Sequence, residues 1–442
     1  MDTYNRKQML LSILLVSYSC LAMAQDSLRR GQNLWRLQDC IQHAIDNNIQ
    51  VTTLLLIRDI SGEQQLQAKA AIRPDLYGSA SPDVRHIGRN SSGSTISIGG
   101  SLGVNSTLNL YKGGYLRNDI ELKGLLVESA NLSLLERIND ITVQVTQAFL
   151  AVLMDKENIV YTQDLLNTTN AQLQRAKQIF AVGSLSRKEL VQAEAQLAQD
   201  RYNLATSINT ERRDRITLKQ LLQISDTSFD IQRPDTIVNT GIIPPLAEVR
   251  STALANRPEV KNADVRVDAA KVGLAKARAL AKPSLDLRSG LGTSYANDPS
   301  TSFIRQFDNN FYQQVGLALS VPIFTKRINR TNINIAKIGI EQAALDRQYT
   351  RVNLELNVER AFANVLNAQA QYDAAVVGMA SAREVYNIAS EELRIGSSNR
   401  VELIIQRNQY IQALQNYLNA KYNAALAARI YDFYRGVPIT ID

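Results

Sequence analysis

The stretch from Phe180 to Leu190, FAVGSLSRKEL, has the pattern expected where one long helix ends and another begins. Gly183 closes a helical pattern that runs back to about Ile120, since glycine adopts a positive φ at little steric cost and commonly ends a helix. Ser186 can cap the first turn of a new helix, and Glu189 three residues later completes a capping-box spacing. The stretch therefore predicts the tip of a long helical hairpin.

A similar stretch, LRIGSSNRVEL, occupies residues 393–403. Gly396 and Glu402 stand 213 residues after Gly183 and Glu189, so the stop and the restart recur at one offset. We interpret the two stretches as two copies of one hairpin.

Weaker similarity between the two halves extends over most of the chain. Pro74, for example, has a counterpart 209 residues later at Pro283. The change of offset implies an insertion in the second copy, in the Ser- and Asn-rich stretch Ala296–Asn310, and loops are where insertions are tolerated. We interpret residues 25–240 and 241–442 as two repeats of one unit, the second with a short C-terminal tail.

Each repeat begins with a pattern that predicts one helix of about 35 residues, Leu34–Ile72 in the first and Leu246–Ala281 in the second. Pro74 and Pro283 follow these helices directly. Proline disfavours helix at the preceding residue and suits a change to extended chain. Strands are therefore expected next.

Between Ile96 and Leu110 the apolar residues hold even-numbered positions, and small or polar residues hold the odd ones. Leu285–Tyr295 and Val315–Ile323 repeat this alternation, while Arg85–Gly93 and Ala296–Asn310 have the composition of loops. Long strands with one apolar face suit a transmembrane β-barrel. Four strands cannot close such a barrel and open edges are not tolerated in lipid, so several chains must share it.

The long hairpin helices, Ile120–Phe180 and Ile333–Leu393, would each span roughly 90 Å at 1.5 Å per residue. Apolar residues near the first tip follow coiled-coil spacing, at Leu166, Leu173 and Phe180. The predicted fold class is an α+β membrane protein built from a duplicated helix, strand, strand, long-hairpin unit.

The N-terminus, Met1–Ala24, has the features of a signal peptide, with Arg6 and Lys7 before an apolar run and a small-x-small ending. Cys20 lacks the preceding aliphatic residue expected of a lipidated cysteine, so a cleaved signal peptide is preferred and lipidation is left open. No later apolar stretch approaches the ~20 residues of a membrane-spanning helix.

The net charge of +7 is spread along the chain without a basic block, which gives nucleic-acid binding no support. The two histidines, His43 and His86, are far apart and offer no metal-ligand spacing. We interpret Cys40 as a small buried helix residue. Gly290–Ser294 has the glycines of a phosphate loop but no GK[ST]. The sequence predicts no enzyme, cofactor or metal site.

The signal peptide, the duplicated order of elements and the glycine tips together resemble the TolC family of outer-membrane efflux channels over about Leu34–Gly436. Ser320–Phe324, SVPIF, is similar to the family's strand-end motif, as is Leu108–Gly114, LNLYKGG, in the first repeat. The first copy lacks the proline and the second lacks the double glycine. The resemblance implies a homotrimer in outer-membrane lipid, with a β-barrel of four strands per chain continued by a periplasmic helical barrel.

The resemblance also implies a function without chemistry, as the passive exit duct of a tripartite efflux system. An inner-membrane efflux pump would be joined to the duct by a periplasmic adaptor, a membrane fusion protein. The residues that would face this adaptor lie at the two tips: Val182, Gly183, Ser184, Leu185, Ile395, Gly396, Ser397 and Ser398.

The pore constriction is implied at Glu189 and Glu402, where like-charge repulsion is expected to raise the pKa of the clustered carboxyl groups. Arg187 and Arg400 are candidates to hold this entrance closed. Ser398 stands where the best-known pattern of the family has an arginine, which leaves the gating role of either arginine open.

Two alternatives remain. A channel for type I protein secretion uses a similar duct, because cargo is selected mainly by the pump. A secreted coiled-coil scaffold or adhesin explains the export signal and the heptads, but it leaves the long alternating strands unexplained. Detergent extraction separates the classes, since a scaffold should be soluble without detergent.

Overall fold

The structure is a computed structural model, which describes residues 34–90, 93–225, 229–234, 243–296 and 302–439, with the side chains of 87–95 and 97 left aside. The elements follow the order α2–α3–β2–β3–α4–α5 and then α6–α7–β5–α8–β6–α9–α10, with β1 and β4 before and after the first series. The chain divides into two compact units. We call Thr53–Glu136 with Leu254–Leu354 the strand unit, and the remaining described residues the helical unit.

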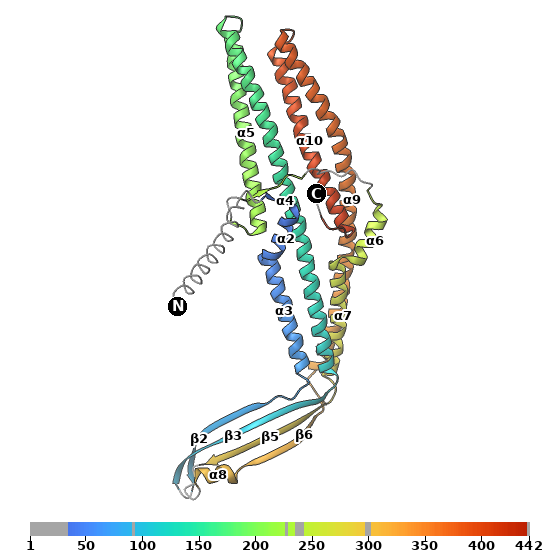
Figure 1. Cartoon of the computed structure of the whole chain (residues 1–442). Helices are drawn as coiled ribbons and strands as arrows, with labels where there is room; N and C mark the ends of the chain where they lie inside the picture. The colour runs from blue at the N-terminus through green and yellow to red at the C-terminus, as the bar shows by residue number, and fades with distance from the viewer. Residues whose placement is uncertain (1–33, 91–92, 226–228, 235–242, 297–301, 440–442) are drawn as a thin grey trace, which may run out of the picture. The chain divides into compact units, whose positions relative to one another are not determined.

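The sheet of the strand unit has four antiparallel strands in the order β2, β3, β5, β6, shown in Figure 1. Their bounds are Tyr77–Asn90 (β2), Gly93–Lys112 (β3), Ser284–Ala296 (β5) and Tyr312–Ser320 (β6). The strands predicted within 96–110 and 285–295 are confirmed. The third predicted strand stops at Ser320 rather than Ile323, because Pro322 has no N–H for the ladder.

The apolar side chains of the strands share one face of the sheet. The register pairs Val84 with Ile98, Val104 with Leu291, Leu108 with Leu287, and Leu287 with Leu317. This face is exposed in the single chain, with Val315 77% and Leu317 66% accessible. The other face carries small and polar residues, such as the cross-strand row Asn105, Gly290 and Gln314. A sheet of this kind suits a boundary between lipid and water.

Each predicted 35-residue helix is in fact two helices, so the single-helix prediction was wrong. The bounds are Leu37–Asn47 (α2), Ile49–Ala70 (α3), Leu246–Asn256 (α6) and Pro258–Ala279 (α7). Asn48 causes the first break, because its Oδ1 accepts from the N–H of Gln50 at 2.9 Å and caps α3. Pro258 causes the second, since it begins a helix well but has no N–H to continue one.

The two predicted loops were also partly wrong. β2 runs on to Asn90 and β3 starts at Gly93, so most of Arg85–Gly93 is strand. Arg85 lies opposite Ser97 on the polar face, where a charged residue does not end a strand. Within Ala296–Asn310, residues Phe303–Asn309 form the short helix α8.

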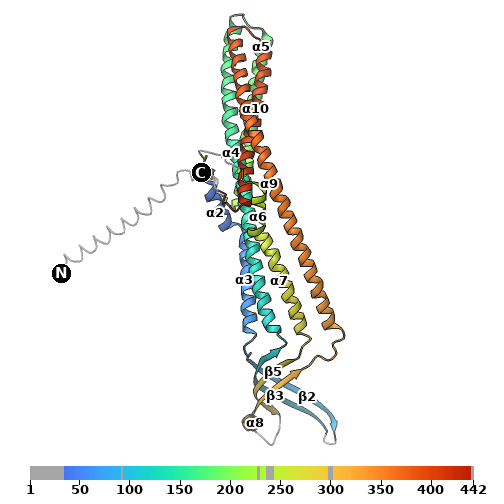
Figure 2. The same cartoon turned by 90° about the vertical axis from the view of Figure 1, so that its right-hand side faces the viewer.

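Two long helices, α4 (Tyr115–Ala181) and α9 (Ile328–Ile395), pass from the strand unit into the helical unit without a break. Each is followed by a return helix, α5 (Arg187–Leu222) and α10 (Arg400–Tyr434). We call α4 with α5 the first hairpin and α9 with α10 the second hairpin; Figure 2 shows both. The long helices exceed their predicted spans by several residues at the end that joins the sheet.

The helical unit also joins the ends of each series of elements. β1 (Leu34–Trp35) pairs in parallel with β4 (Asp230–Ile231), and the Trp35 ring lies edge-on to Phe229 with ring centroids 5.5 Å apart. In the second series the Tyr431 hydroxyl donates to the carbonyl of Pro244 at 2.9 Å. Both series therefore begin and end at contacts within the same unit.

The predicted signal peptide, including Cys20, lies outside the described residues. Within the described ranges, no helix combines the length and the apolarity needed to cross a bilayer. Cys40 is buried in α2, as predicted, and burial raises the pKa of its thiol to about 12.

Candidate functional site: the tips of two helical hairpins

Both hairpins turn through the same backbone motif. Gly183 has φ +77° and Gly396 has φ +80°, which confirms the predicted positive φ at each tip. The N–H groups of Gly183 and Ser184 donate to carbonyls in the last turn of α4 at 2.9 and 3.1 Å. Those of Gly396 and Ser397 do the same in α9 at 3.3 and 2.9 Å. These paired bonds satisfy helix-end carbonyls in a Schellman-type motif.

The predicted adaptor-facing residues differ in accessibility. Val182 and Ile395 are 76% and 65% exposed. Ser184, Ser397 and both tip glycines are also exposed, whereas Leu185 and Ser398 are half-buried. Leu185 packs on the apolar interior of its own hairpin, so it is less available to a partner than its neighbours.

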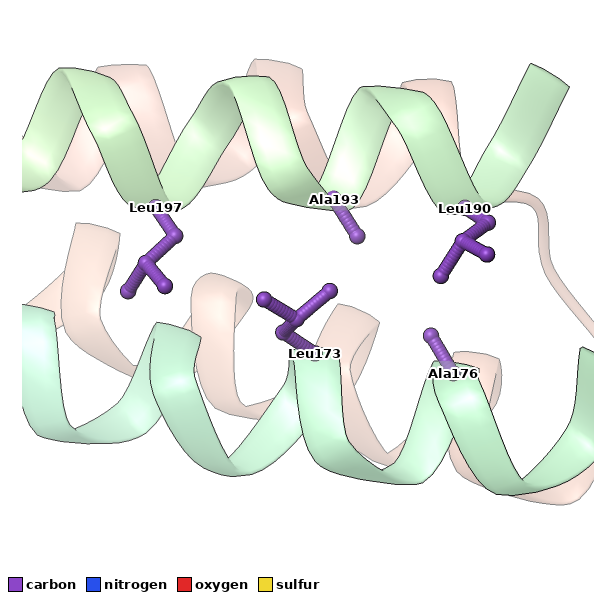
Figure 3. Close-up of a cluster of buried hydrophobic side chains, with 5 residues drawn as sticks. All are labelled: Leu173, Ala176, Leu190, Ala193 and Leu197. Atoms are coloured by element: carbon purple, nitrogen blue, oxygen red, sulfur yellow. The ribbon is translucent and has the colours of Figure 1, made fainter. Parts of the chain in front are cut away.

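An apolar seam holds each hairpin together just behind its tip. In the first hairpin, Leu173 and Ala176 of α4 point toward Leu190, Ala193 and Leu197 of α5, as Figure 3 shows. This confirms the predicted seam at Leu173. The second hairpin closes with aromatic residues instead: Tyr386 and Tyr410 stack with ring centroids 5.6 Å apart beside Leu403.

Glu189 is tied to its own helix start by the predicted capping box. Its N–H donates to Ser186 Oγ at 3.2 Å, while its Oε2 accepts from the Ser186 N–H at 3.0 Å and the Ser186 hydroxyl at 2.8 Å. These bonds, followed by the charge of Arg400, hold the pKa of Glu189 below its usual value. Within the single chain the pKa of Glu189 is lowered because hydrogen bonds to the carboxylate favour its charged form. The expected rise in pKa concerns carboxyl groups clustered from several chains and stays a prediction.

Glu402 stands at the same position in the second hairpin but its carboxylate has a different partner. The N–H of Glu402 donates to Asn399 Oδ1 at 3.0 Å, so Asn399 caps α10. The carboxylate of Glu402 accepts from Gln406 Nε2 at 2.6 Å, one turn further along the helix. The side chain of Glu402 is thus held by a flexible amide rather than by the tip backbone.

The two predicted gating arginines also differ. The Arg187 guanidinium lies over the Phe180 ring of its own hairpin, 6.0 Å from the ring centroid. Arg400 is half-buried, and its Nε is buried with no hydrogen-bond partner among the described residues. Its positive charge contributes to the lowered pKa of Glu189, after the hydrogen bonds from Ser186.

A buried ion pair between the hairpins was not predicted from the sequence. Arg407 Nη2 of α10 lies 2.5 Å from Asp200 Oδ1 of α5, with side chains 4% and 2% exposed. Gln196 Nε2 donates to the same oxygen at 3.1 Å. A cavity of about 270 Å³ lies alongside, lined by polar residues that include Asn158, Thr162 and Ser207.

A signal for this pair was present in the sequence. Asp200 follows Leu197 by three residues and Arg407 follows Leu403 by four, so each occupies a seam position of its return helix. A charged residue in a seam implies a buried partner of opposite charge.

A cluster of acidic residues lies deeper in the first hairpin. Asp155 of α4 is buried against Asp214 and Glu211 of α5. Burial, followed by the charge of Asp214, raises the pKa of Asp155 to about 7. No group of three or more His, Cys, Asp or Glu residues in the described ranges is arranged to hold a metal ion.

The sequence description of the family termed outer membrane efflux protein matches residues 40–222 and again 249–429. Two relatives extend this match. Alkaline protease secretion protein AprF of Pseudomonas aeruginosa is 23% identical over 306 residues, which cover 67% of this chain and 62% of AprF. Cation efflux system protein CusC of Escherichia coli K12 is 31% identical over 125 residues, which cover 28% of this chain and 25% of CusC. The matched part is therefore less than two thirds of either relative.

Solved structures show the same fold over nearly the whole chain. A structure of CusC has a TM-score of 0.79 at 18% identity and covers 92% of this chain and 94% of its own. The CmeC outer membrane channel of Campylobacter jejuni has a TM-score of 0.76 at 20% identity, with 91% and 86% covered.

An amphipathic antiparallel sheet continued by long helical hairpins with exposed tips is thus the architecture of an outer-membrane channel. This chain belongs to the outer membrane efflux protein family. It is an outer-membrane protein whose long hairpin helices lie in the periplasm.

Proposed function

We propose that this chain is the outer-membrane exit duct of a tripartite efflux system, conducting passively what an inner-membrane pump delivers through a periplasmic adaptor. The observation that carries this proposal is the sheet with an exposed apolar face and two edges, β2 and β6. In lipid, the unpaired N–H and C=O groups of an edge each cost several kcal/mol. Pairing β6 of one chain with β2 of the next removes every edge.

A homotrimer follows from this pairing. With four strands from each chain, three chains make a barrel of a size known among outer-membrane proteins, and the polar face forms a wet lumen. The hairpins of three chains would then continue the barrel as a periplasmic helical tube. This arrangement needs no catalytic residue and no cofactor.

A duplicated unit, residues 25–240 and 241–442, is part of the proposal. Its support is that the family description matches the chain twice. The paired element lengths agree, at 67 and 68 residues for the long helices and 36 and 35 for the return helices. Duplication gives each chain two hairpins of similar reach.

The tips are the proposed contact with the adaptor, through the exposed Val182 and Ile395 and the backbone around the two glycines. Glu189, Glu402, Arg187 and Arg400 are proposed to line the entrance just behind them. The contribution of Arg400 in the second hairpin to the lowered pKa of Glu189 in the first supports an entrance at which charges from both hairpins interact.

The mass of the detergent-solubilised protein tests the assembly. We expect a trimer with intact β content, and a cation-preferring conductance after reconstitution in planar bilayers. A monodisperse monomer that keeps its strands would contradict the shared barrel.

Protein secretion is the second candidate, favoured by the similarity to AprF, whose name denotes secretion of an alkaline protease. The similarity to CusC, which is named for cation efflux, favours the efflux of small solutes instead. A deletion strain distinguishes the two. If the strain loses an extracellular protease and its sensitivity to metal salts and drugs is unchanged, the proposed function becomes protein secretion and not efflux.

A further inference from the structure

The short helix α8 lies at the end of the sheet remote from α7, as Figure 1 shows. It connects β5 to β6, and three hydrogen bonds attach it to β5. Thr293 Oγ1 donates to the Phe307 carbonyl at 2.8 Å, and the N–H of Ala296 donates to Gln306 Oε1 at 2.8 Å. Asn310 Nδ2 donates to the Ser294 carbonyl at 2.7 Å. The position of α8 on the strand is therefore fixed.

The register shows which face of the sheet α8 covers. Tyr295 lies opposite Gly100, two positions from the pair Leu102–Thr293 and four from Val104–Leu291. Because side chains alternate along a strand, Tyr295 and Thr293 share the apolar face with Leu291. Since the side chains of Tyr295 and Thr293 hold α8, this helix contacts the apolar face, which is the outer face of the proposed barrel.

Aromatic contacts complete the attachment. The Tyr295 ring meets Phe303 edge-on at 5.0 Å and lies parallel to Phe307 at 6.2 Å between ring centroids. Gly100 makes room for this ring, because a Cβ there would come within 2.8 Å of Tyr295 Cε1. The close fit packs three aromatic rings on the outer surface of β3 and β5.

The remaining surface of α8 is apolar and accessible. Phe303 is 56% exposed and Ile304 81% exposed. The element that α8 contacts is the central strand β5, whereas a shared barrel would form at the edges β2 and β6. The surface is instead continuous with the exposed apolar face of the sheet.

We propose that α8 is an interfacial element that inserts Phe303 and Ile304 into the outer leaflet at headgroup level, with lipid as its partner. The assignment rests on the proposed barrel. The long hairpin helices of this outer-membrane protein are periplasmic, so the sheet end that carries α8 is the cell-surface end. Aromatic and aliphatic side chains on a short helix, with the exposed Arg305 beside them, suit the boundary between acyl chains and headgroups.

The single tryptophan of the chain, Trp35, allows a direct test. In a Trp35→Phe background, Phe303→Trp and, separately, Ile304→Trp are reconstituted as full-length trimers in phosphatidylcholine vesicles. The tryptophan emission of each variant is compared with its emission in vesicles of the same lipid brominated at acyl carbons near the headgroup. We expect bromolipid to quench the emission of both about twofold, as for side chains at the interface.

Two controls mark the faces of the sheet. Leu317→Trp reports the lipid-facing side, and Tyr312→Trp reports the polar side, since Tyr312 lies opposite Gly292. Quenching at Leu317 but at neither α8 position overturns the assignment of α8 and leaves the barrel intact. Absence of quenching at Leu317 as well overturns both the barrel and the α8 proposal. Equal quenching at Tyr312 and Phe303 also overturns it, because a side chain on the polar face would then meet lipid as readily as Phe303 does.

Discussion

The two hairpins share a backbone at their tips but differ in what they bury. Asp155, Glu211 and Asp214 in the first hairpin have counterparts 213 residues later in the second at Ala368, Ala424 and Ala427. The first hairpin thus encloses carboxyl groups where the second encloses alanine methyl groups. The tips differ as well. The Glu189 carboxylate is held by Ser186, whereas the Glu402 carboxylate is held by the side chain of Gln406.

Hairpins of similar helix length can therefore differ in how much buried charge their folding must accommodate. Buried carboxylates need partners, and Asp200 of the first hairpin obtains its counter-charge from Arg407 of the second. The first hairpin therefore depends on the second electrostatically.

The largest expected effect comes from removing that counter-charge. Arg407→Met leaves Asp200 buried without a partner, which should lower the free energy of unfolding by about 3–5 kcal/mol. The double variant Asp200→Leu with Arg407→Met should recover most of the loss, since an apolar pair needs no counter-charge. Urea unfolding followed by helical circular dichroism measures both. Equal stability of the single variant and the wild type would show that Asp200 is solvated through the adjacent cavity.

Valine at the tip glycines tests whether the shared backbone matters for partner contact. Gly183→Val or Gly396→Val should cost about 1–3 kcal/mol locally, because a β-branched residue is strained at positive φ. No atom lies within 4 Å of the added Cβ at either site, so the strain comes from φ alone. We expect export to fall at an unchanged amount of trimer.

Gly378→Val, in the middle of α9, is the matched control, since its Cβ would also meet no atom within 4 Å and its φ is not positive. Wild-type export by both tip variants would contradict the tip assignment.

The acidic cluster makes the first hairpin sensitive to pH. The pKa of Asp155 is raised from 3.8 to about 7, so the folded state holds a proton that the unfolded chain has released. The contribution of this proton to the stability of the folded state is complete below about pH 4 and is lost as the pH rises through 7. Asp155→Asn should remove this dependence and stabilise the protein at pH 8 by about 1–2 kcal/mol, after allowance for solvent screening.

Melting temperatures between pH 4 and pH 8 test this sign. Asp373→Asn, which removes an exposed carboxylate from the second hairpin, should leave the pH profile unchanged. A profile that is flat in the wild type would mean that Asp155 is ionised throughout.

The smallest effects separate the two tip glutamates. Glu189→Gln should cost at most about 1 kcal/mol, since it weakens a capping box, and Glu402→Gln should cost less. If these glutamates line the proposed entrance, we expect Glu402→Gln to affect conduction more than Glu189→Gln does. The reason is that the Glu402 carboxylate is free of the tip backbone and can turn toward a passing cation. Bilayer conductance should show the larger loss of cation preference in Glu402→Gln. The opposite order would assign the constriction to Glu189.

Much of this fold could be predicted because its signals are local. A glycine at a helix end, a serine three residues before a glutamate and alternation along β3 each depend on neighbours in sequence, and each was confirmed at Gly183, Ser186 and Ile96–Leu110. The breaks at Asn48 and Pro258 were also local but weak, since a one-residue interruption barely disturbs the periodicity of the flanking helices.

The features that were missed depend on distant residues. Asp200 and Arg407 are 207 residues apart, and only packing of α5 on α10 shows that each completes the other. The helix α8 is short and bounded by polar residues, so its composition is that of a loop. The aromatic contacts with Tyr295 that hold it are seen only in the structure.

The pairing of β1 with β4, together with the bond from Tyr431 to Pro244, has a consequence for covalent connectivity. Each series of elements is closed at its ends by contacts of its own, so neither closure involves the peptide that joins Arg233 to Pro244. That peptide fixes stoichiometry instead, because one of each series is made per chain. Two separate polypeptides divided there would keep every contact described and lose only the guarantee of equal numbers.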